Sequence, residues 1–206
     1  MSSFQDSVNI ANVQSLKILG VNFDKKLFEE HLRATAANAS QKLGLIRKSS
    51  TIFRSTSVNL ICFRSFILPL LEYCSPVWIS SAAQHLKLLD SVASRARYFF
   101  SDCGRFNLDH RSLVSCLCML YKFFFSENHP LSGAIPPIAV HRKPTRASLV
   151  AHEFNLTNVR CSTEQFKRSF IPFSVSVWND LPSHCFGGSL VEFKKLVNKH
   201  LLSIYS

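Results

Sequence analysis

The stretch that decides the fold runs from Leu27 to Lys48 and reads LFEEHLRATAANASQKLGLIRK. Its apolar side chains recur every three or four residues, the interval that places side chains on one face of an α-helix. They are Phe28, Leu32, Ala36, Ala39, Leu43 and Ile46. Asp24 is a suitable N-cap shortly before this run. The pattern predicts an amphipathic helix of about six turns, with an apolar face that other segments must cover.

Two further helices are predicted to cover that face. One spans 56 to about 68 and ends before Pro69, because proline interrupts a helix. The other spans about 82 to 100 and has its own apolar face. This face consists of Leu86, Leu89, Ala93, Ala96 and Phe100. Three helices with short connections predict a small antiparallel bundle.

The ends of the chain differ from this central bundle. Residues 8–23 favour a strand, with Gly20 marking a bend or bulge. Four prolines and a glycine within 128–147 indicate a linker or an extended wrapping segment. Residues 148–160 are ambiguous, with a strand as one option. Further helices are predicted from Asp109 or Ser112 to about Phe125, from 173 to 179 and from 189 to 202.

The expected fold is therefore mainly α, with a short β element at the N-terminus, a three-helix bundle and a mostly helical C-terminal region. The expected division is 1–24, 25–103 and 104–206, with the proline-rich linker at about 128–147. The composition supports a packed core, because 47% of the 206 residues are hydrophobic and 18% are charged. The longest apolar stretches, 60–71 and 113–125, are shorter than the roughly 20 residues that cross a bilayer.

The chain is strongly basic, with 24 Lys and Arg against 13 Asp and Glu and a net charge of +11. This excess favours nucleic acid as a partner, with an anionic membrane surface as the weaker alternative. Between His31 and Leu71 there are six Lys or Arg and no Asp or Glu. Charge of one sign over forty residues is self-repulsive, unless a polyanion neutralises it.

Nine cations are predicted to bind nucleic acid: Arg33, Arg47, Lys48, Arg54, Arg64, Arg95, Arg97, Lys167 and Arg168. At 100 degrees per residue, Arg47 and Lys48 fall within about 60 degrees of Arg33 around the first helix. They flank its apolar stripe, where they would line a groove. The alternative is an ordinary solvated surface, and Lys42, on the far side of that helix, favours it. Phe63, Phe66 and Tyr98 adjoin these cations, but aromatic residues on such apolar helices are expected in the core.

The sequence predicts no catalytic or metal-binding residues. Of its six Asp no two are adjacent, and it contains no P-loop, GxGxxG or GxSxG. Catalysis by one of the eight His stays open. Seven Cys without a CxxC pair argue against a zinc ribbon, although a mixed site at Cys103 and His110, or at Cys161 and His184, stays open. An odd number of Cys without a signal peptide predicts an intracellular, unsecreted protein of the nucleus or cytoplasm.

Several phrases resemble the reverse transcriptases of non-LTR (LINE-type, jockey-like) retrotransposons. They are LKILGV at 16–21 followed by Asp24, Leu27 and His31; LGLIR at 43–47; ILPLLEYCSPVW at 67–78; the helix from Leu86 to Arg97; RSFIP at 168–172; VWNDLP at 177–182; and Ser189, Phe193 and Lys194. In that family these phrases occur in this order from the end of the palm onward. The resemblance extends from about residue 15 to 203, although Phe173 stands where the family often has a basic residue.

This resemblance implies the C-terminal segment of an RNA-directed DNA polymerase, beginning after the catalytic palm. The central bundle would be a thumb-like unit that binds RNA and DNA, largely without reading sequence. Mg²⁺ would belong to the intact polymerase, and the segment alone would be inactive. Two alternatives are a non-enzymatic nucleic-acid-binding protein that reuses the module, and a helical protein whose basic face meets an acidic protein.

Overall fold

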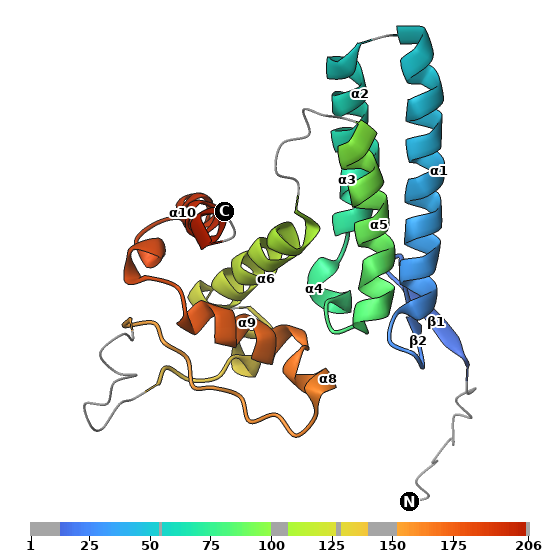
Figure 1. Ribbon diagram of the computed structural model, residues 1–206. Coiled ribbons are helices and arrows are strands. Elements are labelled where there is room, and N and C mark those ends of the chain that lie inside the picture. Colours follow the sequence, from blue (N-terminus) through green and yellow to red (C-terminus); the bar gives the residue numbers. More distant parts are fainter. Residues whose placement is uncertain (1–12, 54, 100–106, 127–128, 140–151, 205–206) are drawn as a thin grey trace, which may run out of the picture.

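A computed structural model describes residues 13–53, 55–99, 107–126, 129–139 and 152–204 (Figure 1). The protein is mainly α-helical with a two-stranded antiparallel sheet near the N-terminus, which confirms the predicted fold class. The first elements are β1 (Ser15–Ile18), β2 (Val21–Asp24), α1 (Glu29–Phe53), α2 (Thr56–Cys62), η1 (Phe63–Ile67), α3 (Leu68–Glu72), α4 (Ser75–Trp78) and α5 (Ala83–Phe99). They are followed by α6 (Leu108–Phe125), η2 (Ser132–Ala134), α8 (Glu164–Lys167), α9 (Phe170–Asn179), η3 (Ser183–Phe186) and α10 (Leu190–Ile204).

The sheet is a tight hairpin in which Ile18 faces Val21. Leu19 and Gly20 form its turn with φ of 47° and 85°, the left-handed conformation that two-residue hairpin turns require. Gly20 thus marks a turn between two strands rather than a bend within one strand. The Tyr73 hydroxyl donates a hydrogen bond to the Leu19 carbonyl at 2.7 Å, which ties the hairpin to the helices.

The long helix α1 begins two residues later than predicted. Leu27 and Phe28 have positive φ values of 56° and 68°, so the backbone becomes helical only at Glu29. Asp24 nevertheless serves this helix start, because its carboxylate accepts hydrogen bonds from the Lys26 and Glu30 amides, each at 2.8 Å. Asp24 was predicted as the N-cap residue, and its side chain does accept from a first-turn amide, but it lies at the end of β2, five residues before Glu29.

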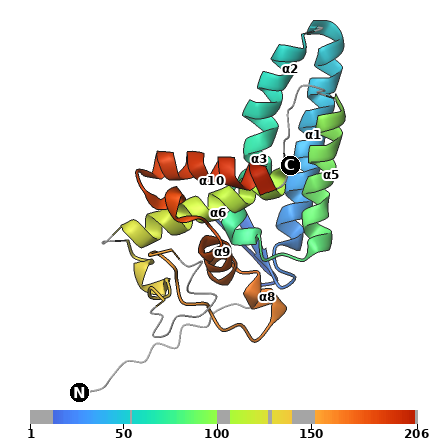
Figure 2. The same cartoon turned by 60° about the vertical axis from the view of Figure 1, so that its left-hand side comes forward.

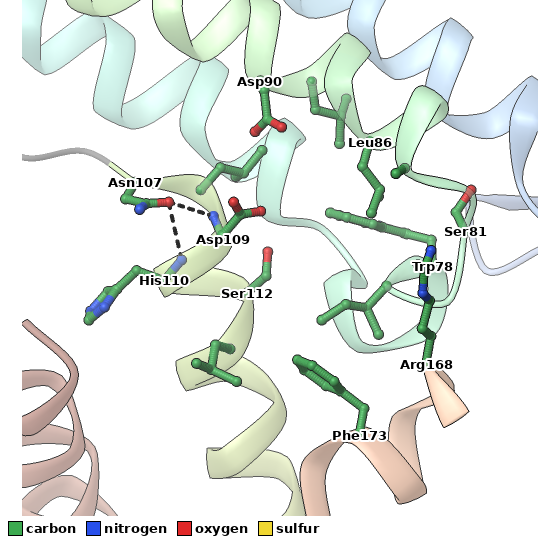
Figure 3. A pocket seen from close by; sticks show the side chains of 15 residues that line it. Trp78, Ser81, Leu86, Asp90, Asn107, Asp109, His110, Ser112, Arg168 and Phe173 are labelled. Atoms are coloured by element: carbon green, nitrogen blue, oxygen red, sulfur yellow. Dashed lines mark hydrogen bonds between the residues drawn. The ribbon is translucent and has the colours of Figure 1, made fainter. Parts of the chain in front are cut away.

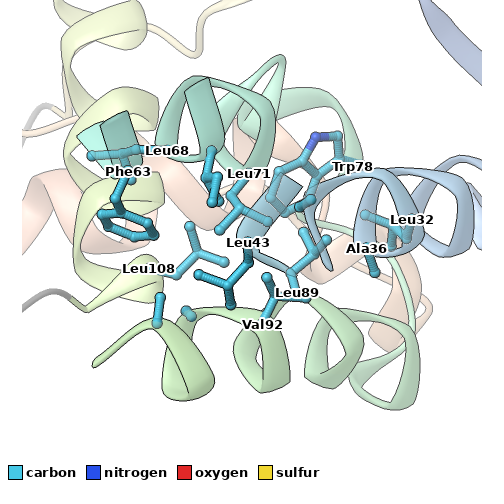
Figure 4. Close-up of a cluster of buried hydrophobic side chains, with 14 of the residues drawn as sticks. Leu32, Ala36, Leu43, Phe63, Leu68, Leu71, Trp78, Leu89, Val92 and Leu108 are labelled. Atoms are coloured by element: carbon cyan, nitrogen blue, oxygen red, sulfur yellow. The ribbon is translucent and has the colours of Figure 1, made fainter. Parts of the chain in front are cut away.

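The predicted apolar stripe of α1 is buried along its whole length. It packs against α2, η1, α3 and α5 in the first hydrophobic core, shown in Figure 4. Figure 1 shows α1 running beside the α2–α3 segment and α5. The periodicity of one helix therefore identified one side of the bundle core.

The second helical segment does not end before Pro69, which corrects the prediction. It continues through the π-helical turn η1 into α3, and Leu68 N–H donates to the Phe63 carbonyl five residues earlier. Pro69 lies in the first turn of α3, where the missing N–H costs little. The wider turn shifts the hydrogen-bond pattern so that the chain accommodates the proline.

A second hydrophobic core is built by α6, α9, α10 and the segment around Leu156. Figure 2 shows α6 between α10 and α9, and both helices contact it. The N-cap of α6 is Asn107, whose side chain accepts from the Asp109 and His110 amides, and not Asp109 or Ser112 as predicted. Asparagine is as good an N-cap residue as aspartate, so α6 begins directly after Asn107, which is the first suitable side-chain acceptor in this segment.

The remaining C-terminal predictions hold in part. The helices at 173–179 and 189–202 are present as α9 and α10, and α9 begins earlier, at Phe170. Within 152–160 there is no strand, only a single bridge between Leu156 and Ile138. Of the predicted linker, 129–139 carries the short turn η2, while residues 128 and 140–147 lie outside the described residues.

The segment 152–156 is held to the end of α9 by side-chain hydrogen bonds. Asn179 accepts from the Leu156 amide and donates to the Leu156 carbonyl, both at 2.8 Å, as a neighbouring strand would. The Trp178 indole donates to the Phe154 carbonyl at 2.9 Å. His152 adds a contact of 3.1 Å between its Nε2 and the Trp178 carbonyl. Trp178 and Asn179 of α9 thus satisfy backbone groups of this segment that a neighbouring strand would otherwise satisfy.

We expect Asn179→Ala to lower the free energy of unfolding by about 2–4 kcal/mol, because two buried backbone groups of Leu156 lose their partner. Urea denaturation measures this change. Asn158→Ala is the matched control, since exposed Asn158 only accepts one bond from Asn179. Equal losses in the two variants would contradict the role assigned to Asn179.

Candidate nucleic-acid interface

Two of the predicted cations, Arg47 on α1 and Arg95 on α5, lie on one hollow. It has a volume of about 410 Å³ and lies between these two helices. Its lining consists of Ser40, Leu43, Gly44, Arg47, Ser94, Arg95, Tyr98 and Phe99. No Asp or Glu lines it among the residues that the structure describes. We call this feature the α1–α5 hollow.

Both guanidinium groups are held in place by neighbouring side chains. The Arg47 guanidinium carbon lies 4.6 Å from the centre of the Phe99 ring, a cation–π contact. Arg95 donates from Nη2 to the Ser40 hydroxyl at 2.7 Å and from Nε to the Ser91 carbonyl at 3.3 Å. Because a guanidinium has several N–H donors, these bonds fix Arg95 and leave other donors for an anion.

Two of the three aromatic side chains that adjoin predicted cations in the sequence are more exposed than predicted. Tyr98 is 85% exposed at the edge of the hollow, and Phe66 on η1 is 58% exposed. Only Phe63 lies in the core as predicted, with 2% exposure. The prediction is wrong for Tyr98 and Phe66 because both lie on bundle helices but face away from the two cores.

Arg33 is not part of the α1–α5 hollow. It lies fourteen residues from Arg47, about 21 Å along the helix axis. Its guanidinium pairs with the Glu29 carboxylate one turn earlier, at 2.9 Å. Hydrogen bonds from Arg33 and then from Lys26 lower the pKa of Glu29, so this carboxylate stays charged. Arg33 is the first cation in the stretch from His31 to Leu71 that contains no Asp or Glu. Glu29, which neutralises Arg33, lies just before that stretch.

The other predicted cations are distributed over several elements. Lys48 and Arg64 are exposed on α1 and η1. Arg97 on α5 donates to the Ser94 hydroxyl at 2.8 Å, and Lys167 on α8 lies 3.7 Å from Glu164. Arg168 lines a different cavity, and Arg54 lies outside the described residues. Among the predicted cations that the structure describes, only Arg47 and Arg95 are therefore brought together on one hollow.

The different cavity lies between α4, α5, α6 and the start of α9 and has a volume of about 580 Å³ (Figure 3). Asp90 and Asp109 lie on its wall beside Ser112, and Trp78 contributes apolar surface. We call it the junction pocket, because it lies between the two hydrophobic cores. Sequence reasoning missed it, since its two acids are nineteen residues apart on separate helices and form no motif.

Burial, and then the nearby charge of Asp109, raises the pKa of Asp90, while Arg97 opposes the shift. The charged carboxylate is thus destabilised in the folded protein. Across the described ranges, no three His, Cys, Asp or Glu side chains gather as metal ligands would. None of the described helices combines the length and the apolar character that crossing a membrane requires.

Comparisons with known proteins add no relative, since no protein-family model, no curated protein and no solved structure matches this chain.

We expect Asp90→Asn to stabilise the protein at pH 7, by up to about 1 kcal/mol for a partly exposed charge. A raised folded-state pKa means that the folded protein binds this proton more tightly than the unfolded chain does. The gain from the neutral amide should therefore be present at pH 7 and shrink as the pH falls and Asp90 itself becomes protonated.

Thermal melts at a series of pH values measure this gain. Asp180→Asn is the control, because Asp180 is exposed and lies outside the junction pocket. A variant at Asp90 that melts lower than the parent at pH 7 would contradict the prediction.

Proposed function

We propose that this chain binds nucleic acid through the α1–α5 hollow, as the thumb-like C-terminal segment of a non-LTR retrotransposon reverse transcriptase. In this role the chain would bind RNA and DNA and would have no catalytic centre of its own. The magnesium chemistry of the intact polymerase would belong to palm carboxylates that this segment does not carry. The sequence resemblance supports the family, and the geometry of the hollow supports the binding.

The observation that carries the proposal is that Arg47 and Arg95 line one hollow together with the exposed ring of Tyr98. Phosphate recognition uses fixed guanidinium groups, because their N–H donors match phosphate oxygens. A single strand also offers base faces, which stack on aromatic side chains. The α1–α5 hollow provides both kinds of contact within one surface, and neither kind reads base identity.

We expect Arg47→Gln with Arg95→Gln to weaken binding to single-stranded RNA and DNA alike, whatever the base sequence. The log–log dependence of affinity on salt should become shallower by about 0.7 for each phosphate contact removed, or about 1.4 for both. Fluorescence anisotropy over a range of salt concentrations measures affinity and slope together. Glutamine keeps the side chains polar, so far-UV circular dichroism should show unchanged helicity.

The matched control is Arg160→Gln with Lys199→Gln, which removes the same charge from exposed positions outside the α1–α5 hollow. If net charge alone governs binding, both double variants lose affinity equally and the proposed interface is wrong. Polyglutamate serves as a competitor. Displacement of RNA by polyglutamate at equal charge concentration would favour an acidic protein as partner.

Tyr98 should add a stacking contact that is specific for unpaired bases. We expect Tyr98→Ala to weaken single-strand binding by about 1–3 kcal/mol. Binding to duplex should change much less, because its bases are already stacked. Tyr98→Phe keeps the ring and should retain the affinity of the parent. Electrophoretic mobility shifts with matched single strands and duplexes test this difference, and a loss in Tyr98→Phe as large as in Tyr98→Ala would exclude stacking.

A further inference from the structure

The junction pocket combines two carboxylates with a mainly apolar wall. Asp90 comes from α5 and Asp109 from the first turn of α6. The rest of the wall is built largely from Trp78, Leu86, Leu89, Leu113 and Phe173. Figure 3 shows Asp90 and Asp109 near one end and Arg168 beside Trp78 on another side. The pocket therefore has an acidic end, although the whole chain is strongly basic.

Local structure explains only one of these acids. A carboxylate in the first turn of a helix is favourable, so Asp109 has a structural role. Asp90 is in the middle of α5, and within the described residues the charge of Arg97 only partly offsets the effects of burial and of Asp109 on its carboxylate. A half-buried acid beside a second acid costs stability unless a cation neutralises it.

Ser112 gives an independent indication of a ligand. It is only 4% exposed and lines the junction pocket, and its hydroxyl has no hydrogen-bond partner within the described part of the chain. In Figure 3 the hydroxyl points toward the part of the pocket where the two carboxylates lie. A buried hydroxyl without a partner destabilises the fold, and a bound donor group would remove that loss.

We propose that the junction pocket binds a small organic cation, an ammonium or amidinium group carried on a flat apolar body. The charged group would lie between Asp90 and Asp109 and donate a hydrogen bond to the Ser112 hydroxyl. The apolar body would pack against Trp78 and Phe173, with Arg168 outside the cationic end. The positive charge of the rest of the chain does not prevent this, because salt screens distant charges more than contacting ones.

The test uses benzamidine as the cationic probe and benzamide as its neutral counterpart of the same shape. Fragment-sized ligands bind with a Kd of about 1 mM, which suits NMR titration of labelled protein. The chain has two tryptophans, so the indole N–H signal of Trp78 reports on the pocket and that of Trp178, fully buried in the second core, is an internal control. Trp78→Phe assigns the two signals.

We expect benzamidine to move the Trp78 signal and the Ser112 amide signal while the Trp178 signal stays in place. Asp90→Asn and Asp109→Asn should each weaken benzamidine about tenfold, as expected for loss of a charge-assisted hydrogen bond. Asp180→Asn should bind benzamidine as the parent does. Because Asp90→Asn is expected to stabilise the fold, a loss of binding in that variant is separable from unfolding.

Four results would overturn the proposal. Equal binding of benzamide would show an apolar void without charge selection. Tighter binding of benzoate would show an anion site at Arg168. Unchanged affinity in Asp90→Asn and Asp109→Asn, or no shift of Trp78 at ten times the expected Kd, would remove the site. None of these results depends on nucleic-acid binding at the α1–α5 hollow.

Discussion

The fold depends on the burial of α6 around most of its circumference. Leu108 at its start belongs to the bundle core, whereas Leu113, Leu117 and Leu120 belong to the second core. A helix that is apolar around most of its circumference must be covered by other elements on most of its sides. The first core supplies cover at one end of α6, and α9 and α10 supply it along the rest. The junction pocket arises where these two sets of packing contacts meet, since neither core fills the space between them.

Sequence patterns predicted the parts of the fold that depend on local spacing. The stripe on α1 was found because burial of a single helix face imposes a period of three to four residues. The path through Pro69 was missed because a π-helical turn is set by packing of Phe63 and Ile67, both buried in the first core. The pairing of Asn179 with Leu156 was missed for a similar reason, because two hydrogen bonds across twenty-three residues leave no periodic signal.

The candidate sites show the same division between local and distant information. Arg47 and Arg95 could be selected individually by charge, but their position on one hollow depends on how α1 and α5 pack. The absence of Asp and Glu between His31 and Leu71 suggested that Arg33 has no acidic partner. This inference was wrong, because Glu29, just before that stretch, pairs with Arg33. The exposure of Tyr98 follows from its place on α5 relative to both cores and not from its apolar neighbours in the sequence.

Helix α5 contributes to both candidate sites from different sides. Asp90 and Arg95 are five residues apart, which separates their side chains by about 140 degrees around the axis. A cation beside Asp90 therefore does not occupy the surface where a phosphate would meet Arg95. The two sites also differ in their response to salt, because binding a polyanion releases condensed counterions and binding one small cation does not. High salt should thus dissociate nucleic acid from the α1–α5 hollow, while the junction pocket keeps most of its affinity for the small organic cation. The two binding assignments can therefore be tested independently of each other.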